Sequence, residues 1–144
     1  MQIQKTKKPK NLNWYFAKAK REFQLYVRLR DSDKNGMCRC CTCGKVVHYK
    51  KCDGGHFIRA TNRAVCFDER NCHAQCKGCN AFQSGAWEKY LIFMQCKYGQ
   101  AVVDELNTFR GVTVKRTRSD YEFIIEENKK KSAGLLAKKT CIDE

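Results

Sequence analysis

Two pairs of cysteines, each separated by two residues, carry the clearest chemistry in this sequence. The first pair is Cys40 and Cys43, followed directly by Gly44, and the second pair is Cys76 and Cys79. A two-residue spacer lets both thiolates face one Zn²⁺, and two such pairs complete a tetrahedral site of the structural kind. We therefore predict that these four cysteines bind one structural zinc ion.

The first pair has an overlapping alternative, because Cys38 and Cys41 also have the two-residue spacing. We favour Cys40 with Cys43 because the turn that closes such a pair often needs a positive φ, which glycine at position 44 adopts freely. The remaining cysteines lack paired spacing, and we expect them to be small buried hydrophobic residues. They are Cys52, Cys66, Cys72, Cys96 and Cys141.

Three further residues could do chemistry between and just after the cysteine pairs, namely His56, Asn71 and Asn80. We predict a β-hairpin whose strands are residues 46–49 and 56–58, a loop, and a short helix behind the second pair. This arrangement places His56 on the second strand, Asn71 in the loop and Asn80 on the helix, so that all three can face one cleft. Two other interpretations of His56 stay open, a hydrogen-bonded structural histidine and a zinc ligand in a Cys₃His site.

The elements that must position these residues follow from periodicity and turn residues. Residues 37–83 have no helical period, so a metal must organise them. A capping-box pattern at Ser119 and Glu122 predicts the start of the final helix. Apolar residues at helical spacing predict helices over residues 12–30, 87–94 and 102–109, with Tyr98 and Gly99 as a break, and over 119–128.

Composition and charge narrow the class of protein. The chain has 144 residues, 11 cysteines and a formal net charge of +14. This length suits one domain, and the positive charge favours a polyanionic partner, above all nucleic acid. No stretch approaches the roughly 20 apolar residues that span a bilayer, so we expect no membrane partner and cysteines in a reducing cytoplasm.

The order of His56, Asn71 and Asn80 resembles the HNH or His-Me finger endonucleases, in which a final His or Asn often follows the second zinc cysteine. The chain is also similar to phage endonuclease VII in its four cysteines and the following asparagine. Several longer motifs narrow the resemblance to the NinG/Rap family of lambdoid phage recombination endonucleases. They are residues 26–31, 54–58, 67–71, 75–80, 84–85 and 99–106.

This resemblance implies a metal-dependent nuclease that cuts branched recombination intermediates such as Holliday junctions and D-loops. It implies that His56 is the general base, for which a near-neutral pKa is suited. Asn80 would bind a catalytic Mg²⁺ or Mn²⁺, and Asn71 would orient the loop and the ring of His56. Gly55 stands where many HNH enzymes have a metal-binding aspartate.

An oxygen ligand is expected from elsewhere, because Mg²⁺ usually takes at least one carboxylate. Asp53, Asp68 and Glu69 are the candidates, and we favour Asp53. Basic residues around the cleft are predicted to hold the DNA backbone. They are Arg59, Arg63, Arg70 and Lys77.

We therefore expect an α+β fold, a zinc-stapled ββα-metal finger flanked by an N-terminal helix and C-terminal helices. A basic arm over residues 1–11 precedes one nuclease domain over 12–128 with its zinc and ββα core at 37–85, and a frayed basic tail over 129–144 follows. The alternative is a non-catalytic zinc-ribbon module that binds branched DNA, while the charge argues against a RING-like protein-interaction domain. Symmetric cutting of a junction would suit a homodimer, and the resemblance implies the cytoplasm of a bacterial host.

Overall fold

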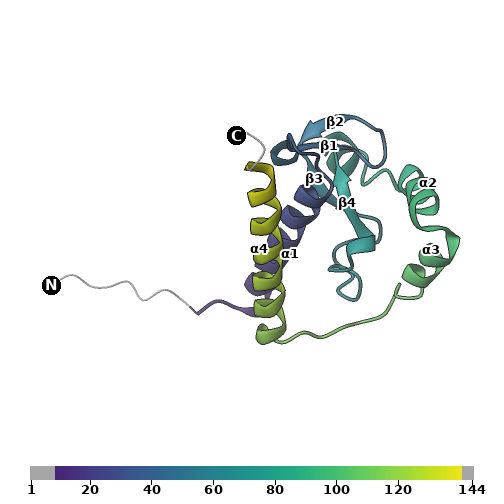
Figure 1. The fold of residues 1–144 in the computed structure, drawn as a ribbon. Coiled ribbons are helices and arrows are strands. Elements are labelled where there is room, and N and C mark those ends of the chain that lie inside the picture. Colours follow the sequence, from purple (N-terminus) through teal and green to yellow (C-terminus); the bar gives the residue numbers. More distant parts are fainter. Residues whose placement is uncertain (1–8, 141–144) are drawn as a thin grey trace.

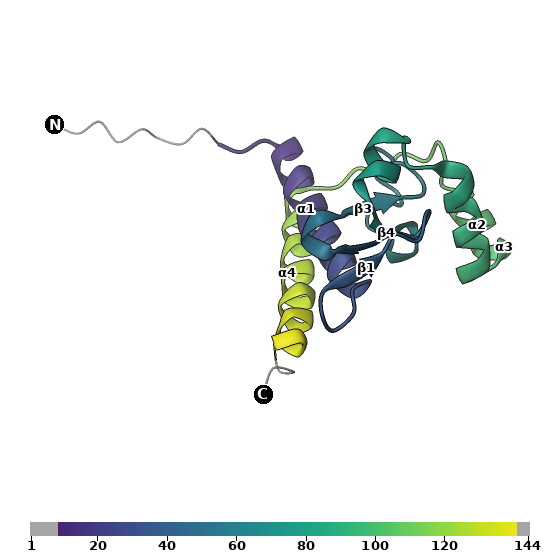
Figure 2. The same cartoon turned by 90° about the horizontal axis from the view of Figure 1, so that it is seen from above.

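A computed structural model describes residues 9–140 of the chain. Most of the predicted basic arm (1–8) and the last part of the predicted tail (141–144) lie outside these residues. Two long helices, α1 and α4, lie side by side along one edge of the molecule (Figure 1). Two small antiparallel sheets lie between this pair and a second helical pair, α2 and α3, as the view from above shows (Figure 2).

The first helix, α1, spans Leu12–Arg30, as predicted. The Asn11 side chain caps it by accepting a hydrogen bond of 3.0 Å from the Trp14 backbone N–H, which satisfies one of the free donors of the first turn. Ala19, Phe23 and Val27 form part of its buried stripe. This apolar face is why the helix packs against the rest of the fold.

The last helix, α4, spans Arg118–Thr140 and differs from the prediction at both ends. Reciprocal hydrogen bonds cap it: Asp120 N–H donates to Thr117 Oγ1 (3.2 Å) and Thr117 N–H donates to Asp120 Oδ2 (2.6 Å). The predicted capping box at Ser119 and Glu122 is therefore wrong, because the observed one lies two positions earlier, at Thr117 and Asp120. The predicted frayed tail is wrong for residues 129–140, which are helical. Burial of Ser132 and two hydrogen bonds from Lys139 to backbone carbonyls of residues 32 and 33 explain why the helix continues.

The strand pairing also differs from the prediction. Strand β1 (Met37–Arg39) pairs with β2 (Val46–His48), and β3 (Asp53–His56) pairs with β4 (Cys72–Gln75). The predicted hairpin of residues 46–49 with 56–58 is therefore wrong. The tight turn lies between β1 and β2 instead, where the first cysteine pair sits, and residues 53–55 are extended strand rather than a turn.

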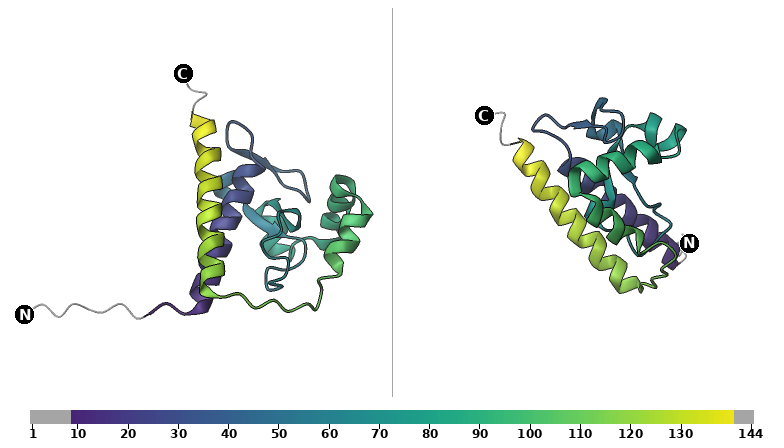
Figure 3. Two further views of the ribbon diagram at one scale, coloured as in Figure 1. Left: turned by 60° about the horizontal axis from the view of Figure 1, so that its bottom comes forward. Right: turned by 90° about the vertical axis from the view of Figure 1, so that its right-hand side faces the viewer.

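The helical pair consists of α2 (Trp87–Tyr98) and α3 (Gln100–Asn107), and the predicted break between them is confirmed. Gly99 makes this break with a φ of +83°. Short helical turns cover Tyr49–Lys51, Glu69–Asn71 and, as a π-turn, Gly78–Phe82. Figure 3 shows the extended segment that leads from α3 back to the start of α4.

The largest cluster of buried apolar side chains joins α2 and α3 to the segment after β3. Its buried members are Phe57, Ile58, Val65, Tyr90, Met94, Val103 and Leu106. A second cluster joins α1 to α4 through Tyr15, Ala19, Tyr121 and Ile125. The fold is thus mixed α+β, with its sheets held between two helical layers. None of the helices among the described residues combines the length and apolar character needed to cross a bilayer.

Candidate zinc centre and candidate active site

The structure brings together the four cysteines that the spacing selected. The Sγ atoms of Cys40, Cys43, Cys76 and Cys79 all lie within 4.8 Å of one another. Cys43 Sγ and Cys76 Sγ are 3.7 Å apart, against about 3.8 Å for two sulfurs bound tetrahedrally to one zinc ion at 2.3 Å. The donor set and its size therefore fit a structural metal such as zinc.

Tight turns hold both cysteine pairs. The Gly44 N–H donates to the Cys40 carbonyl at 2.9 Å, and Gly44 has a φ of +77°, as its glycine predicted. In the second pair the Cys79 backbone N–H points at Cys76 Sγ, 3.5 Å away. Such N–H contacts stabilise negative charge on the sulfurs, so the turns suit thiolate ligands.

The overlapping cysteines lie elsewhere. Cys38 is buried and its thiol donates to the Arg28 carbonyl at 3.2 Å, while Cys41 packs against the cluster around Tyr90. Burial is confirmed for Cys52, Cys66 and Cys72, whereas Cys96 is exposed, so its predicted burial is wrong; Cys141 lies outside the described residues. Cys96 faces solvent because its side of α2 contacts none of the buried clusters.

His56 ends β3, and its ring is held in one orientation. Its Nε2 lies 2.8 Å from the carbonyl oxygen of Cys66, and its Nδ1 lies 3.8 Å from the Sγ of Cys72. Because a carbonyl only accepts hydrogen bonds, Nε2 carries the proton and Nδ1 keeps its lone pair in the neutral ring. Burial lowers the pKa of His56 below its ordinary value. The ring is therefore neutral near pH 7 and can accept a proton at Nδ1.

Asn71 ends the short turn before β4 and is fully buried. Its Oδ1 accepts from the Ile58 N–H at 2.8 Å, and its Nδ2 donates to the carbonyls of Ile58 (2.9 Å) and Val65 (3.1 Å). Its side chain thus ties both ends of the segment that follows β3. Asn71 does not line the cleft, contrary to the prediction that all three residues face it. Its amide oxygen and nitrogen instead form hydrogen bonds to backbone groups inside this loop.

Asn80 lies in the π-turn behind the second cysteine pair, next to Asp53 at the start of β3. Asn80 Nδ2 donates to Asp53 Oδ2 at 3.0 Å, and Lys77 Nζ donates to Asp53 Oδ1 at 2.9 Å. Partial burial opposes ionisation of Asp53, but these two hydrogen bonds hold the pKa of its carboxyl below the ordinary value. Asn80 and His56 line the same shallow pocket, which has a volume of about 410 Å³.

The structure separates the three candidate carboxylates. Asp68 caps the short turn that ends at Asn71, and its carboxylate forms an ion pair with Arg70 at 2.8 Å. Glu69 pairs with Lys131 of α4 at 2.7 Å. Only Asp53 of the three lies beside Asn80 among the described residues.

Position 55 leaves no room for a carboxylate. A Cβ atom there would lie 2.1 Å from Gln75 Oε1 and 3.0 Å from Gln75 Cβ. Gln75 is fully buried on the paired strand β4 and cannot move aside freely. A glycine at position 55 is therefore a packing requirement of this strand pair.

The four predicted DNA-binding residues fall into two groups. Arg59 lines the pockets beside His56 and Lys77 the one beside Asp53, and both are exposed. Arg63 instead donates to the Tyr121 hydroxyl of α4 at 3.1 Å. Arg70 pairs with Asp68 and with Glu105 of α3, and both carboxylates raise its pKa. Arg63 and Arg70 thus link the segment between β3 and β4 to α4 and to α3, respectively.

Sequence reasoning missed several pocket residues. Gln24 and Arg28 of α1 line the pocket beside Asp53 and Asn80, and Gln24 Nε2 donates to the Gly54 carbonyl at 3.1 Å. Their four-residue spacing on one helix face was the available signal. Trp87 of α2 is 49% exposed and lines the pocket beside His56.

Comparisons with known proteins agree on one family. Residues 1–138 match the family described as NinG, Bacteriophage Lambda NinG protein. The chain is 33% identical over 98 residues to protein ninG of Escherichia phage 933W and 32% identical over 98 residues to protein ninG of Escherichia phage lambda. Each alignment covers 67% of this chain and 46% or 45% of the relative, so the chain spans about half the length of these curated relatives. No solved structure matches.

Proposed function

Because this chain belongs to the NinG family of lambdoid phage proteins, we propose that it is an endonuclease that cuts branched DNA, such as Holliday junctions and D-loops, by metal-dependent hydrolysis. One observation carries this proposal. His56, whose ring is neutral, shares a pocket with Asn80, and the Asn80 amide donates to the Asp53 carboxylate. A candidate general base and a candidate carboxylate ligand thus lie in two adjoining pockets that share Asn80.

His56 acts as the general base in this proposal. Its Nδ1, which lies beside Cys72 Sγ in the structure, takes a proton from the attacking water, and the Cys66 carbonyl then stabilises the imidazolium through Nε2–H. The lowered pKa of His56 keeps the ring ready to accept that proton at neutral pH. Asn71 acts as a positioning residue, because it holds both backbone groups of Ile58 and the carbonyl of Val65, the residue directly before Cys66.

The carboxylate of Asp53 and the amide oxygen of Asn80 would hold Mg²⁺ or Mn²⁺. This donor set fits a catalytic magnesium ion, which proteins often bind through one or two carboxylates together with substrate phosphate and water. Such an ion supplies positive charge that stabilises the scissile phosphate and the leaving oxygen. Lys77, which now contacts Asp53 Oδ1, is free to turn toward a DNA phosphate when a cation takes its place.

The cleft has the charge that DNA binding requires. The whole chain carries +14, and exposed Arg59 and Lys77 flank the proposed catalytic residues. Because the zinc cluster sits directly before Asn80, its cysteine pair fixes the start of the π-turn that presents this side chain. Symmetric cutting of a junction would suit a homodimer, and such a phage enzyme works in the cytoplasm of its bacterial host.

A second function is favoured by the contacts of Asp53. Both carboxylate oxygens already accept hydrogen bonds, from Lys77 and from Asn80, so the negative charge is compensated without a cation. No second carboxylate supports Asp53 in a metal-binding group among the residues that the structure describes. This arrangement is what a non-catalytic zinc-stapled module that binds branched DNA would show.

Cleavage of labelled DNA decides between the two functions. Wild type and His56→Ala, matched for zinc content, are incubated with a four-way junction or a linear duplex of the same sequence, in Mg²⁺ or in EDTA. We expect metal-dependent cutting of the junction by wild type, and loss of cutting but not of binding in His56→Ala. His48→Ala is the control, because His48 lies outside the cleft and accepts a hydrogen bond from the Lys50 backbone. Tight junction binding without cutting in Mg²⁺ or Mn²⁺ would refute the nuclease and support the binding module.

A further inference from the structure

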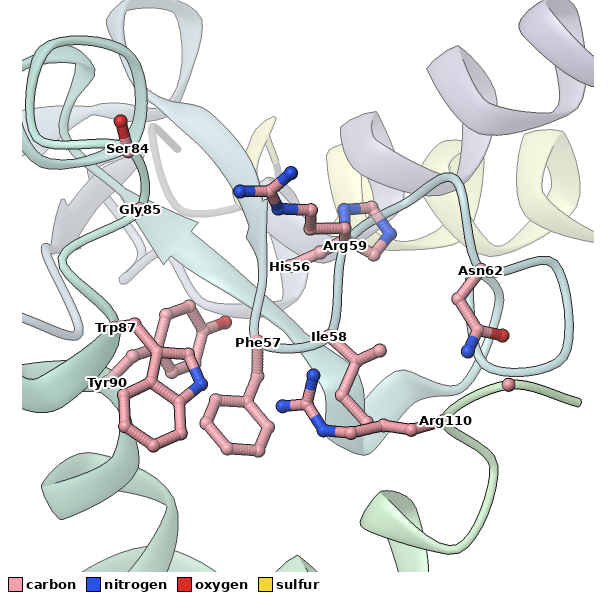
Figure 4. A pocket seen from close by; sticks show the side chains of 11 residues that line it. His56, Phe57, Ile58, Arg59, Asn62, Ser84, Gly85, Trp87, Tyr90 and Arg110 are labelled. Atoms are coloured by element: carbon pink, nitrogen blue, oxygen red, sulfur yellow. The ribbon is translucent and has the colours of Figure 1, made fainter.

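A second pocket, with a volume of about 430 Å³, adjoins the first and shares His56, Arg59, Ser84 and Gly85 with it. This volume lies within the range of about 300–1,000 Å³ that is typical of small-molecule sites. Figure 4 shows the rings of Phe57, Trp87 and Tyr90 together on one side of it, with the guanidinium groups of Arg59 and Arg110 extending from its other walls. We call it the Trp87 pocket.

Trp87 presents a flat aromatic surface at the mouth of this pocket. Its ring lies nearly parallel to Phe57, with 13° between the planes and 6.2 Å between the centroids. Phe57 is buried beside the indole, yet 49% of the Trp87 surface stays exposed. A large half-exposed ring with only two rotatable side-chain bonds offers stacking area at little cost in side-chain entropy.

The backbone before Trp87 is strained to place it there. Ser84 and Ala86 have φ values of +50° and +49°, a region that residues with a Cβ rarely adopt. Ala86 is the residue that directly precedes α2. Strain of this kind persists where the surrounding structure holds it, often beside functional sites.

Two arginines give the pocket a positive rim. Arg59 is exposed, and within residues 9–140 no carboxylate lies within ion-pair distance of it. Arg110 uses its Nε to donate to Asn107 Oδ1 at 2.8 Å, which leaves its terminal nitrogens for other acceptors. Guanidinium groups of this kind bind phosphate oxygens well.

We propose that the Trp87 pocket binds one unpaired nucleobase of the DNA substrate, stacked on the indole, while Arg59 and Arg110 contact the flanking phosphates. This inference rests on the proposed function, because it takes branched DNA as the substrate. Bases in a duplex are stacked on each other and cannot enter a side pocket, whereas a branch point offers unstacked bases without that cost. The pocket adjoins His56, so it couples recognition of a branch to the position of the general base.

The test uses binding and fluorescence without cleavage. In a Trp14→Phe background Trp87 is the only tryptophan, because the chain contains two. The probes are a three-way junction with one unpaired thymine at the branch and the same junction with an abasic residue at that position, both in EDTA. We expect quenching of Trp87 fluorescence by the thymine junction alone. We also expect Trp87→Ala to bind the thymine junction about tenfold to a hundredfold more weakly, the range found when a stacking ring is removed.

Two further variants keep the test decisive. Trp87→Phe retains a stacking ring and should keep most of the affinity, so it also serves if Trp87→Ala fails to fold. Phe123→Ala removes another exposed ring, 67% exposed on α4, which does not line the pocket, and should bind as wild type does. Equal affinity for thymine and abasic junctions, or equal losses in Trp87→Ala and Phe123→Ala, would overturn the proposal.

The outcomes separate this proposal from the nuclease. Base-dependent quenching without any cleavage in Mg²⁺ or Mn²⁺ supports the pocket and refutes catalysis. Cleavage of junctions with base-independent binding supports catalysis and refutes the pocket.

Discussion

Replacing Asn71 with alanine should destabilise the protein well beyond the average substitution. The change removes three buried hydrogen bonds, to the N–H and carbonyl of Ile58 and to the carbonyl of Val65. The Val65 carbonyl keeps a second donor, the Asp68 N–H at 3.1 Å, so two backbone groups of Ile58 lose their partner. A buried polar group without a partner costs about 1–3 kcal/mol.

The expected loss follows from these two groups. They cost about 2–6 kcal/mol together, and a water molecule in the vacated space can satisfy one of them, so we expect about 2–4 kcal/mol. For a chain of this size, each kcal/mol lowers the melting temperature by about 3 °C, so Asn71→Ala should melt about 6–12 °C lower. Such a loss is a large part of a typical stability of about 5–15 kcal/mol.

Urea and thermal denaturation of the zinc-loaded proteins measure this loss. Asn62→Ala is the control, because the Asn62 side chain makes two hydrogen bonds, to the Phe109 carbonyl and from the Ala64 N–H, but is only half-buried. Water can replace its contacts, so we expect a cost below about 1 kcal/mol. If Asn71→Ala costs no more than Asn62→Ala, Asn71 does not hold the loop and its positioning role for His56 is refuted.

Three further predictions follow from the same contacts. Cys79→Ser should lose the bound zinc and the folded state, whereas Cys96→Ser, at an exposed position on α2, should keep both. Metal analysis and circular dichroism measure the two effects, and zinc loss in both variants would contradict the prediction. Burial lowers the pKa of His73 to about 3. Below about pH 6.5 the His73 ring therefore binds a proton in the unfolded chain but stays neutral in the folded protein. His73 should therefore lower the free energy of unfolding by about 2 kcal/mol between pH 7.5 and pH 5. Urea denaturation should show a smaller loss in His73→Gln, and an equal loss would contradict the prediction. Asp53→Asn should abolish metal-dependent cleavage while Asp68→Asn should retain it, and the reverse pattern in the junction assay would place the metal elsewhere.

Local signals in the sequence determined much of the scaffold. Asn11 and the buried stripe set the bounds of α1, and Gly99 set the break between α2 and α3, because caps, periodicity and a positive φ act within a few residues. The same holds for the four-cysteine cluster. Two short spacers fix which thiolates can face one metal ion, so Cys40 and Cys43 were chosen over Cys38 and Cys41 from the glycine that follows.

Contacts between distant segments decided the rest. Strands of three or four residues carry too little pattern to select a partner, so the pairing of β3 with β4 across the loop depended on the burial of Gln75 against Gly55 and of Asn71 beneath the loop. The contact of Asp53 with Asn80 follows from that pairing. The half-exposed ring of Trp87 likewise depends on where Phe57 packs. Residue types and spacings therefore determined what chemistry this chain can do, and the tertiary packing decided which of those residues meet, because burial and hydrogen bonding between remote segments are summed only in the folded protein.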